Sequence, residues 1–132
     1  MSYEDIRIAG DLTEALEAWL VKRYCKVIDI EVRGVNEGEY AAVAYAAVEG
    51  AHAGEGVVEG VVLLLKHDPK GGADRYLIND MGENEGPVVD YCPIRILDQL
   101  SPTDDHLAIH WRDRCREQAL RPSGRSAFSL NS

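Results

Sequence analysis

Long apolar runs are absent from this sequence. The longest unbroken series of branched aliphatic residues runs only from Val61 to Leu65, whereas a membrane-spanning helix needs about 20 apolar residues. The first residues include Glu4 and Asp5, where a secretory signal has a basic start and an apolar run. We therefore predict neither export nor a membrane span.

Cysteine is also scarce. Cys25, Cys92 and Cys115 stand at wide and irregular spacing. This pattern fits neither a disulfide framework nor the paired CxxC knuckles of a zinc site. The sequence therefore favours a reducing compartment, and we predict a cytoplasmic protein.

Positive charge is in short supply. The chain has 14 Lys and Arg against 23 Asp and Glu, for a formal net charge of -9. Binding to a phosphate backbone needs clustered cations, so we predict no direct contact with nucleic acid. The acidic excess leaves two interpretations open: solubility alone, or a basic protein partner, including one whose nucleic-acid site the acidic surface imitates.

Fingerprints of bound cofactors are missing as well. The glycine-rich segments contain neither a GxGxxG nor a GxxxxGKS or GxxxxGKT motif. The acidic segment that starts at Asp80 does not match a calcium loop, because Gly82 and Glu85 occupy its third and sixth positions and Tyr91 its twelfth. We predict no cofactor and no bound metal.

What is present indicates a domain of the α+β class. The 132 residues suit one domain, which we place at residues 1–120, followed by a flexible tail at 121–132. Residues Asp11 to Tyr24 repeat apolar side chains at helical spacing, which predicts an amphipathic helix. Four segments rich in β-branched residues follow, at about 27–33, 40–48, 56–67 and 74–80. Short glycine-rich turns between them predict a four-stranded antiparallel meander.

The C-terminal half predicts a loop and two helices. Residues 81–91 are rich in glycine, acids and amides and suit a loop, after which Pro93 opens a short helix. Ser101 to Asp104 resembles a capping box and predicts a final helix that ends near Gln118. We expect the helices to pack mainly on one face of the sheet, and the other face to be a surface for dimerisation.

Two groups of side chains could carry chemistry. Cys92 precedes Pro93 at a helix start and would be a nucleophile if His106 or His110 approached it; the alternative is a buried cysteine of the core. His106 and His110 lie four residues apart on a helix, where two imidazoles can share a metal ion. Two solvent-facing histidines are the alternative.

The segment 80–115 resembles a known family of small domain-of-unknown-function proteins encoded on plasmids, integrative elements and phage-like islands. The matching residues are Asp80, Met81, Glu83, Gly86, Pro87, Cys92, Pro93, Ile96, Leu97, Asp98, Leu100, Pro102, Thr103, Ala108, Trp111, Arg112, Arg114 and Cys115. The resemblance implies an accessory cytoplasmic protein of mobile DNA, with no activity to carry over. That family often has an acid after the Asp-Met pair, where this chain has Gly82.

Six residues around the loop are not obviously needed by a stable fold. They are Asp80, Glu83, Asp90, Tyr91, Cys92 and Arg112. One interpretation makes them a binding site. The other has the arginine grip one of the carboxylates and tie the last helix to the loop.

These observations lead to two hypotheses about function. The first is a non-enzymatic protein-interaction module, self-associating or bound to a protein partner through its acidic surface; an anti-defence protein that imitates DNA is its most specific form. The alternative is a small enzyme or ligand-binding domain with its site around the segment from Asp80 to Cys92.

Overall fold

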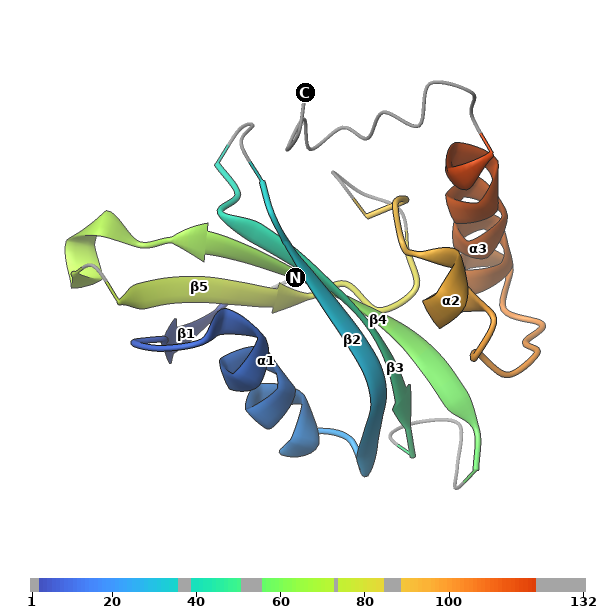
Figure 1. The fold of residues 1–132 in the computed structure, drawn as a ribbon, viewed down its shortest axis with the longest axis horizontal. Helices are drawn as coiled ribbons and strands as arrows, with labels where there is room; N and C mark the ends of the chain where they lie inside the picture. Colours follow the sequence, from blue (N-terminus) through green and yellow to red (C-terminus); the bar gives the residue numbers. More distant parts are fainter. Residues whose placement is uncertain (1–2, 36–38, 51–55, 73, 85–88, 121–132) are drawn as a thin grey trace.

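The structure is a computed structural model, and it describes residues 3–35, 39–50, 56–72, 74–84 and 89–120. These residues form one antiparallel sheet in the order β1-β5-β4-β3-β2, together with three α-helices (Figure 1). The strands are β1 (Glu4–Arg7), β2 (Lys26–Gly34), β3 (Ala42–Glu49), β4 (Val58–His67) and β5 (Arg75–Asp80). The helices are α1 (Leu12–Val21), α2 (Ile94–Leu97) and α3 (His106–Ala119), and Pro69–Gly71 forms a 3-10 turn.

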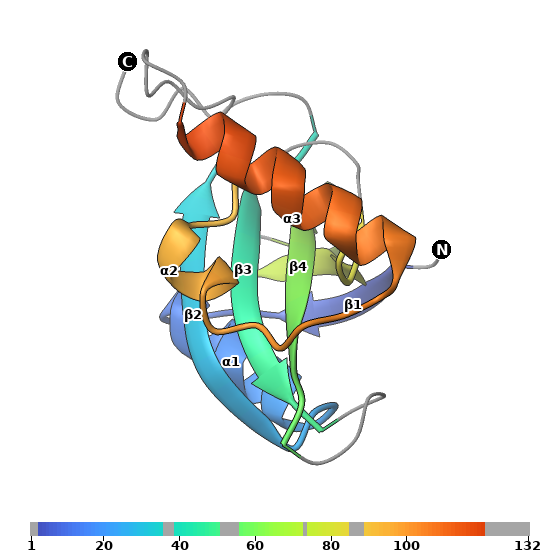
Figure 2. The ribbon, with the colours of Figure 1, turned by 90° about the vertical axis from the view of Figure 1, so that its right-hand side faces the viewer.

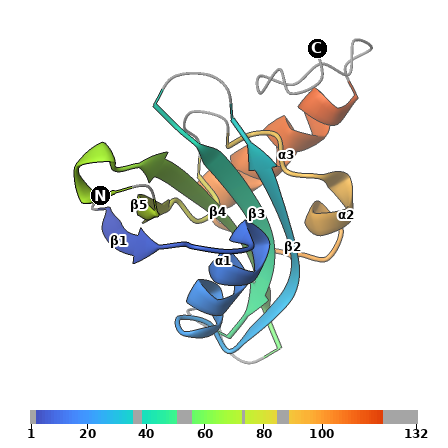
Figure 3. The same cartoon turned by 60° about the vertical axis from the view of Figure 1, so that its left-hand side comes forward.

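The α+β class and the four predicted strands are confirmed, but the sheet has a fifth strand. β1 pairs antiparallel with β5 at the edge of the sheet (Figure 3). The prediction missed it because β1 has only four residues and no alternation long enough to read. Its position is held by ion pairs from Arg7 to Asp74 and from Arg75 to Asp5, at 3.0 and 2.7 Å.

The prediction that the helices lie mainly on one face is wrong. α1 packs on one face of the sheet, where Leu16 and Leu20 are fully buried. α2 and α3 pack on the opposite face, where α3 crosses β3 and β4 and buries Trp111 (Figure 2). β3 is buried along almost its whole length because helices cover both sides of it. The open face on which the expected dimer depended is therefore not found among the described residues.

Both long helices begin at aspartate caps. The side chain of Asp11 accepts a hydrogen bond from the backbone N–H of Glu14 at 2.9 Å, as its place before the amphipathic segment suggests. The capping box predicted at Ser101 is wrong, because α3 begins four residues later. Its cap is Asp105, whose carboxylate accepts from the Leu107 N–H at 3.2 Å. Ser101 bonds to β4 instead.

One strand is longer than its neighbour, and this difference positions the candidate site. The β4–β5 ladder ends where Leu63 pairs with Asp80, so the first half of β4 continues beyond β5. Two backbone bonds prolong the contact: Met81 N–H to the Val62 carbonyl at 2.8 Å, and Val62 N–H to the Gly82 carbonyl at 3.2 Å. On the N-terminal side of Val62, where β5 no longer runs beside β4, side chains accept the hydrogen bonds that another strand would accept.

None of the helices in the described part of the chain is both long enough and apolar enough to cross a membrane. The predicted tail at 121–132 lies outside the described residues, as do residues 85–88 of the predicted loop.

Candidate functional site

A groove of about 820 Å³ lies next to the first half of β4, on the side where β5 does not extend; β3 pairs with β4 on the other side. β4, the segment after β5, and the turn into α3 form its walls. The lining residues are Tyr24, Val57, Val58, Glu59, Gly60, Val61, Asp80, Met81, Gly82, Glu83, Ser101, Pro102, Thr103, Asp104, Asp105, Ala108 and Arg112. Three of the six predicted site residues, Asp80, Glu83 and Arg112, are therefore brought together.

The wall nearest α3 is a two-pronged ion pair between Glu83 and Arg112. Arg112 Nε lies 2.5 Å from Glu83 Oε1, and Nη2 lies 3.0 Å from Oε2. Only 10% of the Glu83 side chain and 16% of the Arg112 side chain are exposed. This is the carboxylate grip that the sequence suggested, so Arg112 ties α3 to the segment after β5.

The same two side chains also complete the edge of β4. Glu83 Oε2 accepts a hydrogen bond from the Gly60 N–H at 2.9 Å, and Arg112 Nη1 donates to the Ser101 carbonyl at 2.7 Å. Ser101 bonds to Val58 twice, once through its N–H and once through its hydroxyl, each at 2.9 Å. We call Glu83, Arg112 and Ser101 the latch. Their bonds satisfy backbone groups that a strand would otherwise satisfy, so the role of the latch is structural.

Glycine allows a close approach where the latch meets β4. A Cβ atom at Gly60 would lie 3.0 Å from Glu83 Cγ and 3.1 Å from Cδ. A larger residue would require the Glu83 side chain to shift by a few tenths of an ångström.

The opposite wall presents the carboxylate of Asp80 in a different setting. The Tyr24 hydroxyl donates to Asp80 Oδ2 at 2.7 Å, and the Gly82 N–H donates to Oδ1 at 2.9 Å. Burial and the bond to Asp80 raise the pKa of Tyr24, so its hydroxyl stays a proton donor. Among the described residues, no lysine or arginine lies within ion-pair distance of Asp80. Asp80 is thus oriented by neutral donors and not by a cation.

The charge of the groove is strongly one-sided. Five carboxylates line it, at Glu59, Asp80, Glu83, Asp104 and Asp105, against the single guanidinium of Arg112, which Glu83 neutralises. Val57, Met81 and Pro102 add apolar surface. Such a groove is suited to a cationic group with an apolar stem, and it repels anions.

The other three predicted residues lie elsewhere. Asp90, whose side chain is 10% exposed, pairs with Arg114 at 2.9 Å, and the Tyr91 carbonyl accepts from Arg33 at 3.2 Å. Cys92 is buried in the core beside Trp111. The six residues therefore do not form one site.

Cys92 has the wrong surroundings for a nucleophile. Burial raises the pKa of the Cys92 thiol above its ordinary range, and burial likewise raises that of Cys115 to about 12. An attacking cysteine needs the opposite shift, because the thiolate is the reactive form. The buried position of Cys92 agrees with the alternative interpretation, in which it is a cysteine of the core.

The paired histidines are both exposed on α3. Within the part of the chain that the structure describes, no group of three or more His, Cys, Asp or Glu side chains could hold a metal ion.

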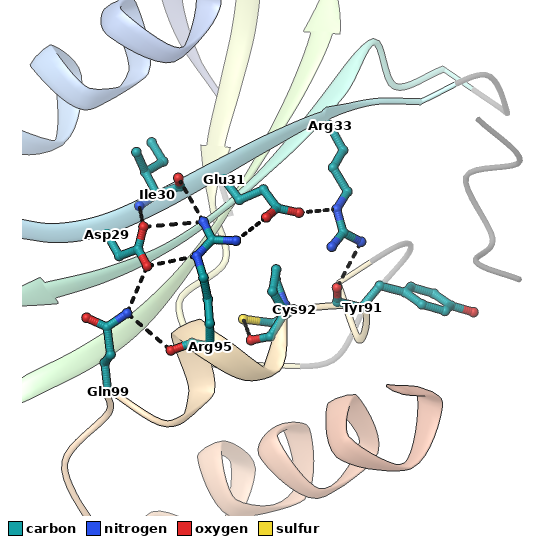
Figure 4. Close-up of polar contacts among 9 residues, drawn as sticks. Asp29, Ile30, Glu31, Arg33, Tyr91, Cys92, Arg95 and Gln99 are labelled. Atoms are coloured by element: carbon teal, nitrogen blue, oxygen red, sulfur yellow. Dashed lines mark hydrogen bonds and ion pairs between the residues drawn. The ribbon is translucent and has the colours of Figure 1, made fainter. Parts of the chain in front are cut away.

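A second polar cluster joins α2 to β2, and the sequence analysis did not identify it (Figure 4). Arg95 Nε lies 3.0 Å from Asp29 Oδ2, Gln99 donates to the same oxygen at 2.8 Å, and Arg95 also contacts Glu31. The Arg95 bond to Asp29 holds the pKa of that carboxyl below its usual range. Burial raises the pKa of Glu31, but hydrogen bonds from Arg95 and Arg33 outweigh burial and leave it lowered. We call Arg95, Asp29, Glu31 and Gln99 the clamp.

Sequence reasoning also missed Tyr24 and Glu59, which reach the groove from the far end of the α1 segment and from β4. Tyr24 served only as an apolar position of the helix in the periodic pattern. The contact of Tyr24 with Asp80 appears only when the segment after α1 packs against the end of β5, which no sequence pattern shows.

No protein-family model, no curated protein and no solved structure matches this chain.

Proposed function

We propose that this chain is a protein-interaction module that binds a basic segment of a protein partner in the acidic groove. The observation that carries the proposal is Asp80, a carboxylate held by Tyr24 and Gly82 and paired with no cation among the described residues. Glu59, Asp104 and Asp105 extend the negative charge along the groove. A lysine or arginine of the partner would pair with these carboxylates, and its stem would lie against the apolar lining.

The alternative, an enzyme centred between Asp80 and Cys92, has less support. The candidate residues are divided between the groove, the Asp90 ion pair and the core. The groove contains several carboxylates, but the thiol that would attack a substrate does not line it and is buried among residues of the α3 core.

The finer form of the proposal is an accessory protein of mobile DNA that acts against a nucleic-acid-binding host protein. Support comes from the net charge of -9 and from the resemblance of the segment 80–115. Proteins that bind DNA present basic residues to its phosphates, and an acidic groove would compete for those residues.

The test measures binding of a hexa-arginine peptide by isothermal titration calorimetry, with a hexa-glutamate peptide as the charge-reversed control. We expect binding of the first peptide alone. The double variant D80N/D104N should weaken it about fivefold, because two exposed ion pairs together contribute on the order of 1 kcal/mol. Raising the salt concentration should weaken binding further.

The matched control is E14Q/E17Q. Both glutamates are exposed on α1 and neither lines the groove, so the variant loses the same charge elsewhere. Equal losses in the two double variants would mean that the peptide senses overall charge, and the groove proposal would be wrong. Absence of any binding to the native chain would refute it outright.

A further inference from the structure

Both oxygens of the Asp80 carboxylate are held, each by a neutral donor. The Tyr24 hydroxyl donates to Oδ2 at 2.7 Å, and the Gly82 N–H donates to Oδ1 at 2.9 Å. The backbone of Asp80 is fixed as well, because this residue pairs with Leu63 at the end of the β4–β5 ladder. The plane of the carboxylate is therefore set before a ligand arrives, which lowers the conformational cost of binding.

These bonds leave acceptor sites on Asp80 for a further pair of donors. A carboxylate has about four acceptor sites, shared between its two oxygens. Tyr24 and Gly82 each use one, so both oxygens keep a site, and no lysine or arginine among the described residues occupies it. Two parallel N–H bonds, one to each oxygen, are what the planar fork of a guanidinium offers.

The groove already contains one fork of this kind. Arg112 Nε and Nη2 contact the two oxygens of Glu83 at 2.5 and 3.0 Å. Asp104 and Asp105, by contrast, are exposed, and one oxygen of Asp105 caps α3. Of the carboxylates that Arg112 leaves free, Asp80 is therefore the one whose two oxygens are both oriented by the fold.

We propose that Asp80 selects arginine over lysine in the basic segment of the partner, and that Tyr24 is the positioning residue for this selection. The inference rests on the function proposed above and names the side chain that the groove recognises. A lysine ammonium is a compact point charge, which pairs with a carboxylate in many orientations. A guanidinium gains its second bond only where both oxygens of one carboxylate are oriented toward it.

Tyr24 suits this role because its hydroxyl stays protonated beside the carboxylate. Burial and the bond to Asp80 raise the pKa of Tyr24 above its ordinary value, so the donor persists at neutral pH. The substitution Y24F removes this donor and alters no charge. A loss of selection in that variant therefore reports on the orientation of Asp80 and not on the charge of the groove.

The test compares hexa-arginine with hexa-lysine by isothermal titration calorimetry at constant salt. We expect the native chain to bind hexa-arginine about tenfold more tightly, because the second N–H bond to a charged oxygen adds to its affinity. In Y24F and in D80E this ratio should fall to about threefold or less. D80E keeps the charge but moves the carboxylate away from the Tyr24 and Gly82 donors, so it tests the same point if Y24F does not fold.

The matched control is Y76F, which removes a phenolic hydroxyl from β5 outside the groove and should keep the native ratio. Equal affinities of the two peptides for the native chain, or a native ratio retained in both Y24F and D80E, would overturn the selection of arginine while the proposed function stood. A ratio lost in D80E but kept in folded Y24F would overturn the role of Tyr24. Failure of both peptides to bind the native chain would instead remove the proposed function.

Discussion

At the scale of single residues, Arg112 is the side chain on which the site depends most. Its guanidinium is largely buried, and it forms an ion pair with Glu83 and a hydrogen bond to the Ser101 carbonyl. Arg116, one turn further along α3, forms an exposed ion pair with Asp98. Removing one partner of a buried pair leaves the other charged and unpaired. The two arginines therefore differ in context although they share a helix.

We expect R112M to lower the free energy of unfolding by about 3 kcal/mol. R116M should lower it by less than about 1 kcal/mol, because Arg116 and Asp98 are solvated. Urea denaturation of both variants measures the difference. Similar losses would show that the latch adds no more stability than a surface ion pair.

At the scale of elements, the clamp fixes a helix too short to be stable by itself. α2 has four residues, and its contacts come from Ile96 and Leu97 in the core and from Arg95 to Asp29 and Glu31 on β2. The clamp should make stability depend on pH. The folded pKa values of Asp29 and Glu31 lie below their reference values of 3.8 and 4.5. Their contribution is thus present above about pH 4.5 and lost as the pH falls through the folded values.

We expect the unfolding free energy of the native chain to fall between about pH 5 and 3. In R95M the fall should be shallower, because the unpaired carboxylates have less to lose on protonation. Denaturation at several pH values measures both slopes. The control is K22M, which removes an exposed cation at the end of α1. If R95M and K22M keep the same slope as the native chain, the clamp does not set the pH dependence.

The elements also show what the sequence can and cannot specify. The four longer strands were predictable because segments rich in β-branched residues are separated by glycine-rich turns, and α1 because apolar side chains recur at helical spacing over 14 residues. β1 was not, since four residues carry too little pattern. The continuous apolar run from Val61 to Leu65 indicates that both faces of β4 are covered. It does not indicate which helix covers which face. The sequence offered an arginine bound to one of the loop carboxylates as one interpretation, but it did not identify Glu83 as that carboxylate. The contact of Asp80 with Tyr24 depends on the packing of α1.

At the scale of the whole molecule, one sheet supports two cores. β3 and β4 contribute side chains to both, so neither helix layer can separate without exposing the strands shared with the other. The two tryptophans report on the layers separately: Trp19 packs at the α1 core and Trp111 is buried in the α3 core.

We therefore predict one cooperative unfolding transition. In W111F, the fluorescence of Trp19 should change at the same urea concentration as the circular dichroism of that variant. In W19F, the fluorescence of Trp111 and the circular dichroism should likewise change at one urea concentration. W111F will be the less stable, because Phe cannot replace the indole bond to the Val89 carbonyl. A Trp19 transition that precedes the loss of circular dichroism would mean that the α1 layer opens independently.

The clamp has one more consequence, for how copies of this chain meet when concentrated. β2 is an edge strand of the sheet, and an uncovered edge invites another chain to add a strand, which is a route to aggregation. At Ile30 the N–H is engaged by the Asp29 carboxylate at 2.9 Å and the carbonyl by Arg95 at 3.4 Å. With both groups of Ile30 occupied in the middle of the strand, an incoming strand cannot form a continuous ladder along β2 without breaking these bonds.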